Sequence, residues 1–272
     1  MIGKVFDRIA AVRNKCTKTE KKLIQGLDNI KTDELIYFSI TELAAELNVA
    51  EATVVRFCRK LGYNGFQDFK LCLSREHGTE EISDSSPTQR IALKMRDAID
   101  HTSKGLDYDK CLEIADIIVK AKKLSAFGVG NSYIPAIQIC NSFARVGLNV
   151  LVTADSHMET IHVGNMGKGD VLILISVSGS TKDTIDVASI AKQNGVKTVV
   201  ITGYERSPIV KYADYILLSA LHDAVYEGGS LSTLASITYI LDVLFNAIQN
   251  KIGTSASEKM RRTADSVSNK SI

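Results

Sequence analysis

The chain has 272 residues, of which 45% are hydrophobic and 24% are charged, and its formal net charge at pH 7 is +2. This length exceeds that of a usual single domain, and the hydrophobic content is sufficient for real cores, so we expect two compact domains. We find no signal peptide and no apolar run long enough to cross a bilayer, which argues against secreted and membrane classes and predicts a cytoplasmic protein without a membrane partner.

Cysteine and histidine spacing gives no sign of a metal or disulfide framework. The five cysteines lack a CxxC pair, which is typical of reduced thiols in a cytoplasm: Cys16, Cys58, Cys72, Cys111 and Cys140. Among the histidines only His157 and His162 lie close together, and the sequence offers no further ligands around them. We therefore expect neither a metal nor another cofactor.

The first predicted elements are two short helices joined by a tight turn. Ser39 and Glu42 make a capping box, after which one face of the first helix carries Ile40, Leu43, Ala44 and Leu47. The turn begins with Asn48, which tolerates the left-handed conformation, and the second helix turns inward Val54, Phe57, Cys58 and Leu61. This spacing predicts a helix-turn-helix, although an ordinary helical hairpin is the alternative reading.

The outward face of the second helix has the character of a DNA-recognition surface. The helical wheel exposes Glu51, Ala52, Val55, Arg56 and Arg59. Arginine can pair with guanine edges and Val55 can contact a thymine methyl group, while the candidates for phosphate contacts are Thr53, Lys60 and Lys70. Residues 1–76 carry 13 basic and 10 acidic side chains, against 20 and 21 in the remainder, which modestly favours double-stranded DNA as a partner.

A polar stretch, residues 76–87, separates this region from the rest of the chain. It is acidic and low in apolar residues, which is typical of a mobile joint. A helix is expected next, because one face carries Ile91, Met95, Ala98 and Ile99. The last 20 residues are rich in Ser, Lys and Arg, and we expect them to fray or to pair with a neighbouring subunit.

A glycine-containing loop follows the first strand predicted in the second half of the chain. The strand 123–128 leads into GVGNS, Gly128–Ser132, and then into a helix from Tyr133 to Val146. Tyr133 stands where a dinucleotide fingerprint needs its third glycine, and no Walker-type spacing of glycine and lysine occurs. Nucleotide binding is therefore disfavoured.

A second loop, SVSGSTKDT from Ser176 to Thr184, has the composition of a phosphate cradle. It lies between the apolar run Val171–Ile175, typical of a buried parallel strand, and a helix expected to end at Gly195. The unpaired amides and positive dipole end of a helix attract anions, and Gly179 allows close approach of the backbone. Both loops can converge on one ligand at the carboxyl edge of a parallel sheet. The alternative reading is a set of ordinary serine caps.

These loops and the strand pattern resemble a SIS (sugar isomerase) domain over about residues 106–250. The resemblance implies a three-layer α/β/α sandwich whose five-stranded parallel sheet has strands near 123–128, 149–153, 170–175, 197–202 and 215–219. It implies that a phosphorylated sugar is held by the hydroxyl side chains of Ser132, Ser176, Ser178, Ser180 and Thr181. Candidates on the sugar side are His157, in a DxH segment, Glu159 and Glu227. Ser207 and Pro208 should begin a helical turn before the last strand.

The stretch Ala52–Leu73 is similar to the N-terminal domain of the RpiR/MurR regulators, whose architecture joins such a domain to a SIS domain. The resemblance implies an all-α helix-turn-helix domain at 1–76, a linker and connecting helix at 77–105, the SIS domain at 106–250 and a C-terminal tail at 251–272. It implies a transcription regulator, not an enzyme, that acts as a homodimer or homotetramer. Its affinity for operator DNA would respond to a sugar phosphate.

Two positions depart from the family pattern. Ala50 stands where members commonly carry serine, so the helix cap and a phosphate contact there would fall to Glu51 or Thr53. Near the start of the last helix, Glu227 stands where members often carry arginine, and neither the serine-arginine pair nor the glutamine that usually follow is present. The sugar-facing side of the pocket is therefore the least defined part of the resemblance.

Two other functions stay open. A sugar phosphate isomerase or lyase with an accessory DNA-binding domain would need a general base, for which the candidates are His157, Glu159 and Glu227. A DNA-binding protein whose SIS fold serves only for dimerisation is the third reading. A sugar phosphate that stabilises the chain without being consumed would indicate a sensor.

Overall fold

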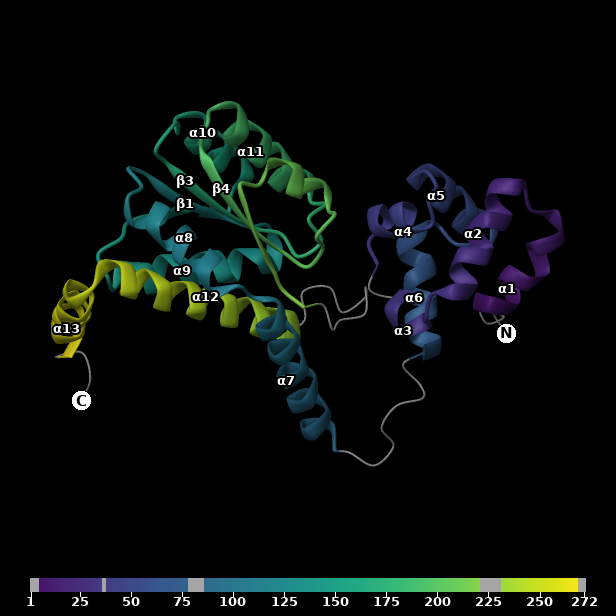
Figure 1. Cartoon of the computed structure of the whole chain (residues 1–272), viewed down its shortest axis with the longest axis horizontal. Coiled ribbons are helices and arrows are strands. Elements are labelled where there is room, and N and C mark those ends of the chain that lie inside the picture. The colour runs from purple at the N-terminus through teal and green to yellow at the C-terminus, as the bar shows by residue number, and fades with distance from the viewer. Residues whose placement is uncertain (1–4, 36–37, 78–85, 221–230, 269–272) are drawn as a thin grey trace. The chain divides into compact units, whose positions relative to one another are not determined.

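The computed structural model describes residues 5–35, 38–77, 86–220 and 231–268. These residues divide into two compact units, one formed mainly by the chain up to Lys94 and the other mainly by the chain from Met95 onward. Figure 1 labels the helices and strands of both units.

The N-terminal unit is helical throughout its described residues. Its elements are α1 (Val5–Val12), η1 (Arg13–Lys15), α2 (Lys18–Asn29), α3 (Thr32–Leu35), α4 (Ile40–Glu46), α5 (Glu51–Lys60) and α6 (Phe66–His77). One apolar cluster joins α1 to α6, and Leu23, Ile24, Phe57 and Phe69 within it are no more than 2% exposed. Apolar residues at helical spacing turn one face of each helix inward. The all-α fold expected for this region is confirmed.

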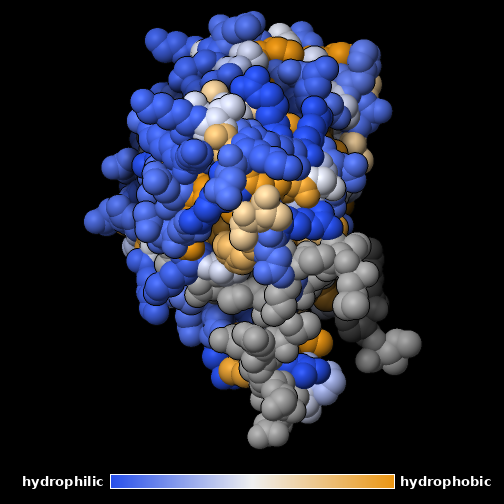
Figure 2. Space-filling model, turned by 90° about the vertical axis from the view of Figure 1, so that its right-hand side faces the viewer, coloured by the Kyte–Doolittle hydropathy of each residue, from blue (hydrophilic) through white to orange (hydrophobic). Residues whose placement is uncertain are grey.

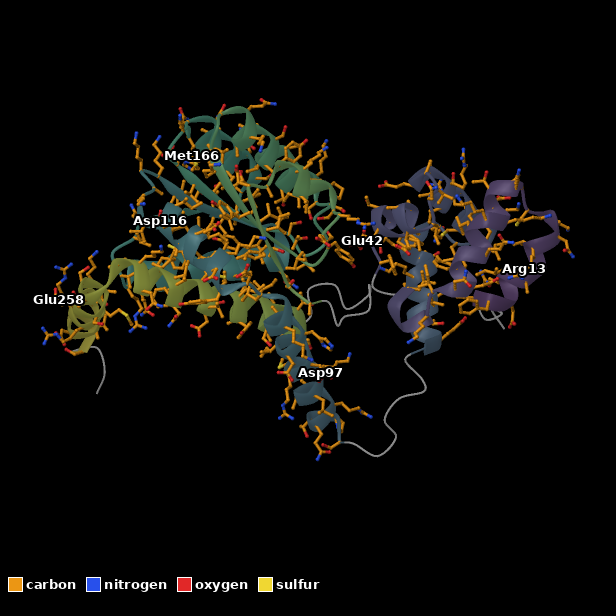
Figure 3. All side chains as sticks on the ribbon, in the orientation of Figure 1. Arg13, Glu42, Asp97, Asp116, Met166 and Glu258 are labelled. Carbon is orange, nitrogen blue, oxygen red and sulfur yellow. The ribbon has the colours of Figure 1, made fainter. Side chains whose placement is uncertain are left out.

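The helix-turn-helix consists of α4 and α5, as the sequence predicts. The capping box is present, because Glu42 N donates to Ser39 Oγ (3.0 Å) and Ser39 N donates to Glu42 Oε2 (2.9 Å); Glu42 is labelled in Figure 3. Asn48 has a φ of 50°, the left-handed conformation that the turn requires. The inner face of α5 is buried to 5% exposure or less at Val54, Phe57, Cys58 and Leu61. The opposite face of α5 is left outward.

A five-stranded parallel sheet forms the centre of the C-terminal unit, which confirms the predicted fold. Its strands are β1 (Leu124–Phe127), β2 (Val150–Val152), β3 (Val171–Ile175), β4 (Lys197–Thr202) and β5 (Tyr215–Leu218), in the order β2-β1-β3-β4-β5. β1 and β3 are neighbours, with Leu124 paired to Val171 and Phe127 to Leu174. The predicted strands differ from these by no more than one residue at either end.

Helices cover both faces of this sheet. The helical elements described after residue 86 are α7 (Pro87–Gly105), α8 (Tyr108–Val119), η2 (Gly130–Ser132), α9 (Tyr133–Ala144), α10 (Ser156–Gly164), α11 (Lys182–Gln193), η3 (Pro208–Tyr212), α12 (Leu231–Ile252) and α13 (Thr254–Ser268). Figure 1 shows α8, α9 and α12 on one face and α10 and α11 on the other. Along β3, Ile173 packs against the face covered by α8, α9 and α12, and Leu172 and Leu174 pack against the face covered by α10 and α11. The apolar run is therefore buried on both sides.

Two helices, α12 and α13, bear on the expectations for the C-terminal residues. α12 has 22 residues and a hydropathy of 1.6 over an 18-residue window, so by length and composition it could cross a membrane. Half of that window is buried, and Ile240, Leu244 and Ile248 belong to the core of the C-terminal unit. Residues 254–268 form the helix α13, which follows α12 and buries Ala256, so this segment is not frayed; its pairing with a neighbouring subunit stays a prediction.

α7 is anchored at its C-terminal end and exposed at its start. Thr102 Oγ1 donates to Ala98 O (2.7 Å) and accepts from Ala220 N (3.0 Å), which ties the helix to the residues that follow β5. Of the predicted apolar face, Ala98 is buried, whereas Ile91 is 55% exposed. Polar residues such as Asp97 project into solvent (Figure 3).

Candidate effector and DNA-binding sites

The serine-rich loop between β3 and α11 is held from behind by the segment that follows β4. Val177 O accepts from Gly203 N (3.0 Å) and Thr202 Oγ1 (3.3 Å), and Gly179 O accepts from Ile209 N (3.0 Å). These bonds occupy carbonyl oxygens, which would repel an anion, and turn them away from the start of α11. The loop is therefore preformed with its carbonyl groups bound elsewhere.

Gly179 is required at the point where this loop meets the β4 segment. Its φ is 59°, and a Cβ atom there would lie 2.0 Å from Ser207 Oγ. Ser207 precedes η3, and Pro208 is the first residue of that turn, as predicted. Ser207 does not cap the turn, however, because its hydroxyl donates to Tyr204 O (2.9 Å). Ser207 instead fills the space beneath Gly179.

Unpaired donors gather at the start of α11. The first intrahelical bond runs from Ile185 N to Thr181 O (3.0 Å), so the amides of residues 182–184 lie ahead of the hydrogen-bond ladder. Thr181 is the N-cap residue, and its side chain makes no capping bond to the described helix. Ser176 Oγ and Thr184 Oγ1 are buried without a hydrogen-bond partner among the described residues. Buried hydroxyls in this state favour a ligand that supplies acceptors.

The other two hydroxyls of the loop are exposed and bond locally. Ser178 Oγ accepts from Ser180 N (3.3 Å), and Ser180 Oγ donates to Ser178 O (3.2 Å). Ser178 can still donate its own hydroxyl hydrogen. The arrangement combines free amides, hydroxyl donors and a helix N-terminus, the usual components of a phosphate site.

The GVGNS loop lies at the same edge of the sheet, because β1 and β3 are parallel neighbours. A Cβ atom on Gly128 would lie 2.3 Å from Ser132 O, so this loop also closes tightly on a glycine. Ser132 is half-exposed at the start of α9 and makes no side-chain capping bond to that helix. The structure thus brings both predicted loops, which follow β1 and β3, to the same edge of the sheet.

The sugar-side candidates lie in different environments. Asp155 caps α10 by accepting from Met158 N (2.8 Å), and His157 is exposed in the first turn of that helix. Glu159 is buried and does not face a ligand as predicted, because its side chain is 0% exposed and its Oε1 atom lies 2.7 Å from Ser125 Oγ in β1. Burial raises the pKa of Glu159 to about 7. Glu227 lies outside the described residues, which contain no cluster of three metal-ligating side chains.

The predicted recognition face of α5 is accessible. Arg56 and Arg59 are exposed, and the contacts that they make within the described chain are long: Arg56 Nη2 to Thr53 Oγ1 at 3.5 Å and Arg59 Nε to Asn64 O at 3.4 Å. Val55 is half-buried, and Glu51 accepts from Thr41 Oγ1 of α4 (2.7 Å). The coloured atoms turned toward the viewer in Figure 2 are mostly hydrophilic, with a small apolar patch among them. A duplex could reach both arginines without unfolding any element.

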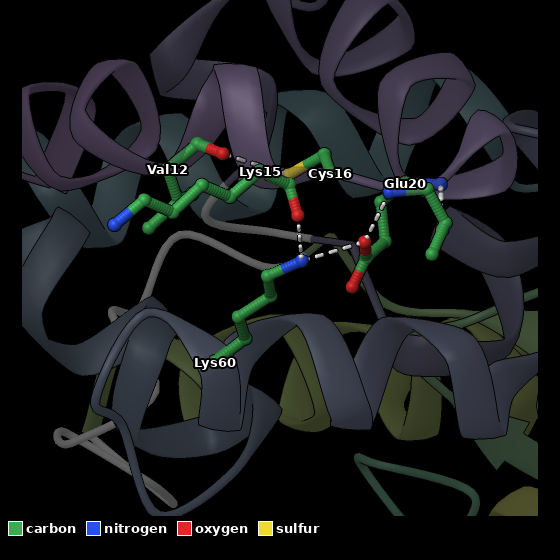
Figure 4. A network of polar contacts seen from close by, with 6 residues as sticks. Val12, Lys15, Cys16, Glu20 and Lys60 are labelled. Carbon is green, nitrogen blue, oxygen red and sulfur yellow. Dashed lines mark hydrogen bonds and ion pairs between the residues drawn. The ribbon is translucent and has the colours of Figure 1, made fainter.

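Two lysines predicted to contact phosphates are engaged within the N-terminal unit. Lys60 Nζ bonds Glu20 Oε2 (2.8 Å) and Lys15 O (2.8 Å), which joins the end of α5 to the start of α2 (Figure 4). Lys70 is 1% exposed, donates to Phe38 O and lies over the Phe66 ring, and burial lowers its pKa to about 8. Lys70 is therefore a structural residue, and its assignment to DNA was wrong.

The sequence reasoning missed the capping residues that organise α2. Thr17 N donates to Glu20 Oε2 (2.7 Å) and Glu20 N donates to Thr17 Oγ1 (3.3 Å), a second capping box whose T-x-x-E spacing is visible in the sequence. The same carboxylate oxygen receives Lys60, and these bonds lower the pKa of Glu20 and raise that of Lys60. Lys22 Nζ also reaches Asn48 O (3.3 Å) in the turn. α2 thus contacts both ends of the recognition helix.

Comparisons with known proteins agree with this two-part architecture. Residues 3–80 match the helix-turn-helix domain of the rpiR family, and residues 117–247 match the SIS domain. An uncharacterised HTH-type transcriptional regulator of Clostridium perfringens is 32% identical over 97% of this chain and 99% of its own. The HTH-type transcriptional regulator HexR of Escherichia coli is 29% identical over 97% of this chain and 94% of its own.

Solved structures extend the similarity to the fold. The Vibrio vulnificus NanR protein, complexed with ManNAc-6P, has a TM-score of 0.85 at 24% identity and covers 98% of this chain and 99% of its own. The sugar isomerase domain of an RpiR transcription factor from Sphaerobacter thermophilus has a TM-score of 0.58 at 22% identity, covering 66% of this chain and 99% of its own. Sequence and fold together place the chain in the rpiR family of helix-turn-helix transcriptional regulators with a C-terminal SIS domain.

Proposed function

We propose that this regulator binds a phosphorylated sugar at the two loops of its SIS domain and that the bound sugar controls its affinity for operator DNA. The observation that carries the proposal is the buried Ser176 hydroxyl, which has no hydrogen-bond partner among the described residues and lies beside the first-turn amides of α11. A phosphate group supplies acceptors for these donors and carries the charge that a helix N-terminus favours. The similarity to NanR, which was solved with ManNAc-6P, supports this class of effector.

Within the proposed site, each loop has a separate role. Ser176, Ser178, Ser180 and Thr181 hold the phosphate together with the amides of residues 182–184. Ser132 contributes from the neighbouring loop, and His157 at the start of α10 orients sugar hydroxyls. The preformed loop binds phosphate without reordering, because its carbonyl oxygens are already bonded to the β4 segment.

On the DNA side, we assign base or phosphate contacts to Arg56 and Arg59, with Val55 and Thr53 beside them. Both arginines are exposed on the outward face of α5 and are not committed to an ion pair in the described part of the chain. A single helix-turn-helix reads a short half-site, so we expect a homodimer or homotetramer on a palindromic operator. Half-site centres should be separated by about 34 to 36 Å or multiples of that distance.

The alternative of a sugar phosphate isomerase is weakened by the environment of Glu159. A general base must reach the proton that it removes, and this carboxyl group is 0% exposed beneath β1 and β2. His157 is the accessible candidate among the described sugar-side residues. Solved SIS folds do include a protein described as a putative sugar-phosphate isomerase, so turnover has to be measured directly.

A thermal-shift screen of sugar phosphates, including ManNAc-6P, tests the proposal. We expect at least one compound to raise the unfolding temperature, to remain unconsumed after long incubation, and to change the affinity for a duplex selected by the full-length chain from a random pool. The unphosphorylated sugar serves as the matched control and should bind far more weakly. Consumption of the stabilising compound would favour the enzyme, and stabilisation without any effect on DNA affinity would contradict effector control.

A further inference from the structure

Glu159 places a wholly buried carboxyl group between α10 and the sheet. Its Oε1 atom lies 2.7 Å from Ser125 Oγ in β1, and the same hydroxyl lies 3.1 Å from Leu151 O in β2. Its Oε2 atom is buried and has no hydrogen-bond partner among the residues that the structure describes. One hydroxyl group thus faces two acceptors, and one carboxyl oxygen has no donor among the described residues.

Counting hydrogens decides between the two forms of this carboxyl group. Ser125 has a single hydroxyl hydrogen, so it cannot donate to Glu159 and Leu151 O at once. If Glu159 is ionised, Ser125 must turn to it, and a charged Oε2 is buried without a donor. If Glu159 is neutral, it donates to Ser125 Oγ, and Ser125 donates to Leu151 O. The neutral form supplies a hydrogen to both Ser125 Oγ and Leu151 O and leaves only an uncharged Oε2 without a donor, which costs far less than a buried charge. The 2.7 Å separation is a usual O–H···O distance.

The elements packed around this group supply no charge to compensate an ionised form. Apart from Ser125, β1 and β2 carry only apolar side chains. The buried residues of α11 are uncharged: Thr184, Val187, Ala188 and Ala191. The ionisable residues of α10 and of the first turns of α11 are exposed or half-buried: Asp155, His157, His162, Lys182, Asp183 and Asp186. No ion pair therefore stabilises a carboxylate at this position within the described chain.

We propose that Glu159 is a neutral carboxylic acid that positions the start of α10, and with it His157, at the edge of the sheet where the phosphate loop lies. α10 begins directly after β2, whose carboxyl end borders that of β1, so the bond from Glu159 to Ser125 sets the distance between this helix and the sheet. Glu159 contacts no ligand in this role; it acts through the helix. The role in effector binding rests on the proposed function, whereas the neutral state does not.

This arrangement makes α10 sensitive to pH. Burial raises the pKa of Glu159 to about 7, so the stability that it contributes is complete below the ordinary value of 4.5 and is lost as pH rises through about 7. Above that pH the carboxylate can no longer donate a hydrogen bond to Ser125. Water must then enter the site, or α10 must move so that the carboxylate reaches water. The helix start should then loosen.

Infrared spectroscopy of the full-length chain tests the neutral state without a ligand. At pH 6 the wild type should show the carbonyl band of a protonated carboxylic acid that is absent from Glu159→Gln, and the band should disappear as pH rises through about 7. Ser125→Ala removes the acceptor of the Glu159 proton and should move the band. Lack of any difference between the wild type and Glu159→Gln at pH 6 would overturn the proposal.

Hydrogen exchange tests the positioning role, again without a ligand. Amides of α10 should exchange equally in the wild type and in Glu159→Gln at pH 6 and faster in the wild type at pH 8, because glutamine donates to Ser125 at both values. Amides of α8 serve as the internal control. Equal exchange in α10 at both pH values would show that ionisation does not reach the helix and would also overturn the proposal.

Titration with ManNAc-6P tests the consequence for binding. At pH 8 a group with a pKa of about 7 is about 90% ionised, so wild-type affinity relative to Glu159→Gln should fall about tenfold between pH 6 and pH 8. Comparing the two proteins cancels the titration of the ligand phosphate. A constant ratio would refute the link to binding. If ManNAc-6P binds neither protein, the same comparison is made with the sugar phosphate that raised the unfolding temperature in the screen. If no sugar phosphate binds either protein, the proposed effector site is at fault, and the infrared and exchange results still decide the state of Glu159.

Discussion

Lys70 offers a direct test of the packing in the N-terminal unit, through the substitution Lys70→Met. The ammonium group is 1% exposed, and its partners are a backbone carbonyl, that of Phe38, and the ring of Phe66. Burial lowers the pKa from 10.5 to about 8, which corresponds to about 3 kcal/mol against the charged form, since each pKa unit is worth about 1.4 kcal/mol. Methionine keeps the length and removes the charge.

At pH 7 we expect Lys70→Met to stabilise the N-terminal unit by about 2 kcal/mol, because the lost hydrogen bond offsets about 1 kcal/mol of the gain. The direction in which stability changes with pH follows from the number of protons that the folded and unfolded chains bind. Between pH 8 and pH 10.5 the unfolded chain binds more protons than the folded chain at this lysine, so wild-type stability should rise with pH in that window. The methionine variant should lack this rise.

Urea unfolding of the full-length chain, followed by hydrogen exchange of α6, measures both effects. Lys60→Met is the matched control, because Lys60 is ion-paired and its pKa is raised, so its substitution should not stabilise the unit. A methionine variant at position 70 that is less stable than the wild type at pH 7, or that keeps the rise above pH 8, would refute the reasoning about burial.

Four further predictions follow from the two sites. Replacing Arg56 and Arg59 together with alanine should abolish gel-shift binding of the selected duplex and leave the unfolding temperature nearly unchanged, because exposed positions contribute little to folding; retained binding would contradict the recognition face. Ser178→Ala should weaken a phosphorylated effector by about 1 to 3 kcal/mol in calorimetry and spare effector-free DNA binding, and equal loss of both would indicate a structural loop. Gly179→Ala should lower the unfolding temperature of the C-terminal unit more than Gly195→Ala, since both glycines have positive φ but only Gly179 would clash, with an atom 2.0 Å away; similar shifts would count against that contact. Finally, saturating duplex should change the effector dissociation constant by the factor that effector changes the DNA constant, and identical effector titrations with and without duplex would exclude coupling.

Much of the fold was predictable because its signals are local. The run Val171–Ile175 is long enough and apolar enough to specify a buried strand, and the capping box of Ser39 and Glu42 marks a helix start by spacing alone. Asn48 at a tight turn carries its own conformational signature. These features depend on neighbours within a few residues, which a sequence shows directly.

The sites were less predictable because exposure depends on distant partners. Lys70 looked like a surface lysine on an amphipathic helix, and only the carbonyl of Phe38, 32 residues away, accounts for its burial. Glu159 looked like a sugar-facing carboxylate, and its partner Ser125 lies 34 residues earlier in β1. Lys60 lies on the side of α5 that packs against α2, where Glu20 accepts its hydrogen bond. Charge and periodicity cannot distinguish such residues from those that await a ligand.

The hydrogen bonds between the serine loop and the β4 segment separate two tasks of the proposed effector site, holding the phosphate and recognising the sugar. Because Val177 and Gly179 are bonded to residues behind the loop and Ser207 fills the space under Gly179, the shape of the loop does not depend on what lies in front of it. The loop would serve any phosphomonoester equally well. Discrimination among sugars would then reside in the residues around the sugar of the proposed site, and a regulator with this design could acquire a new effector by changing those residues alone.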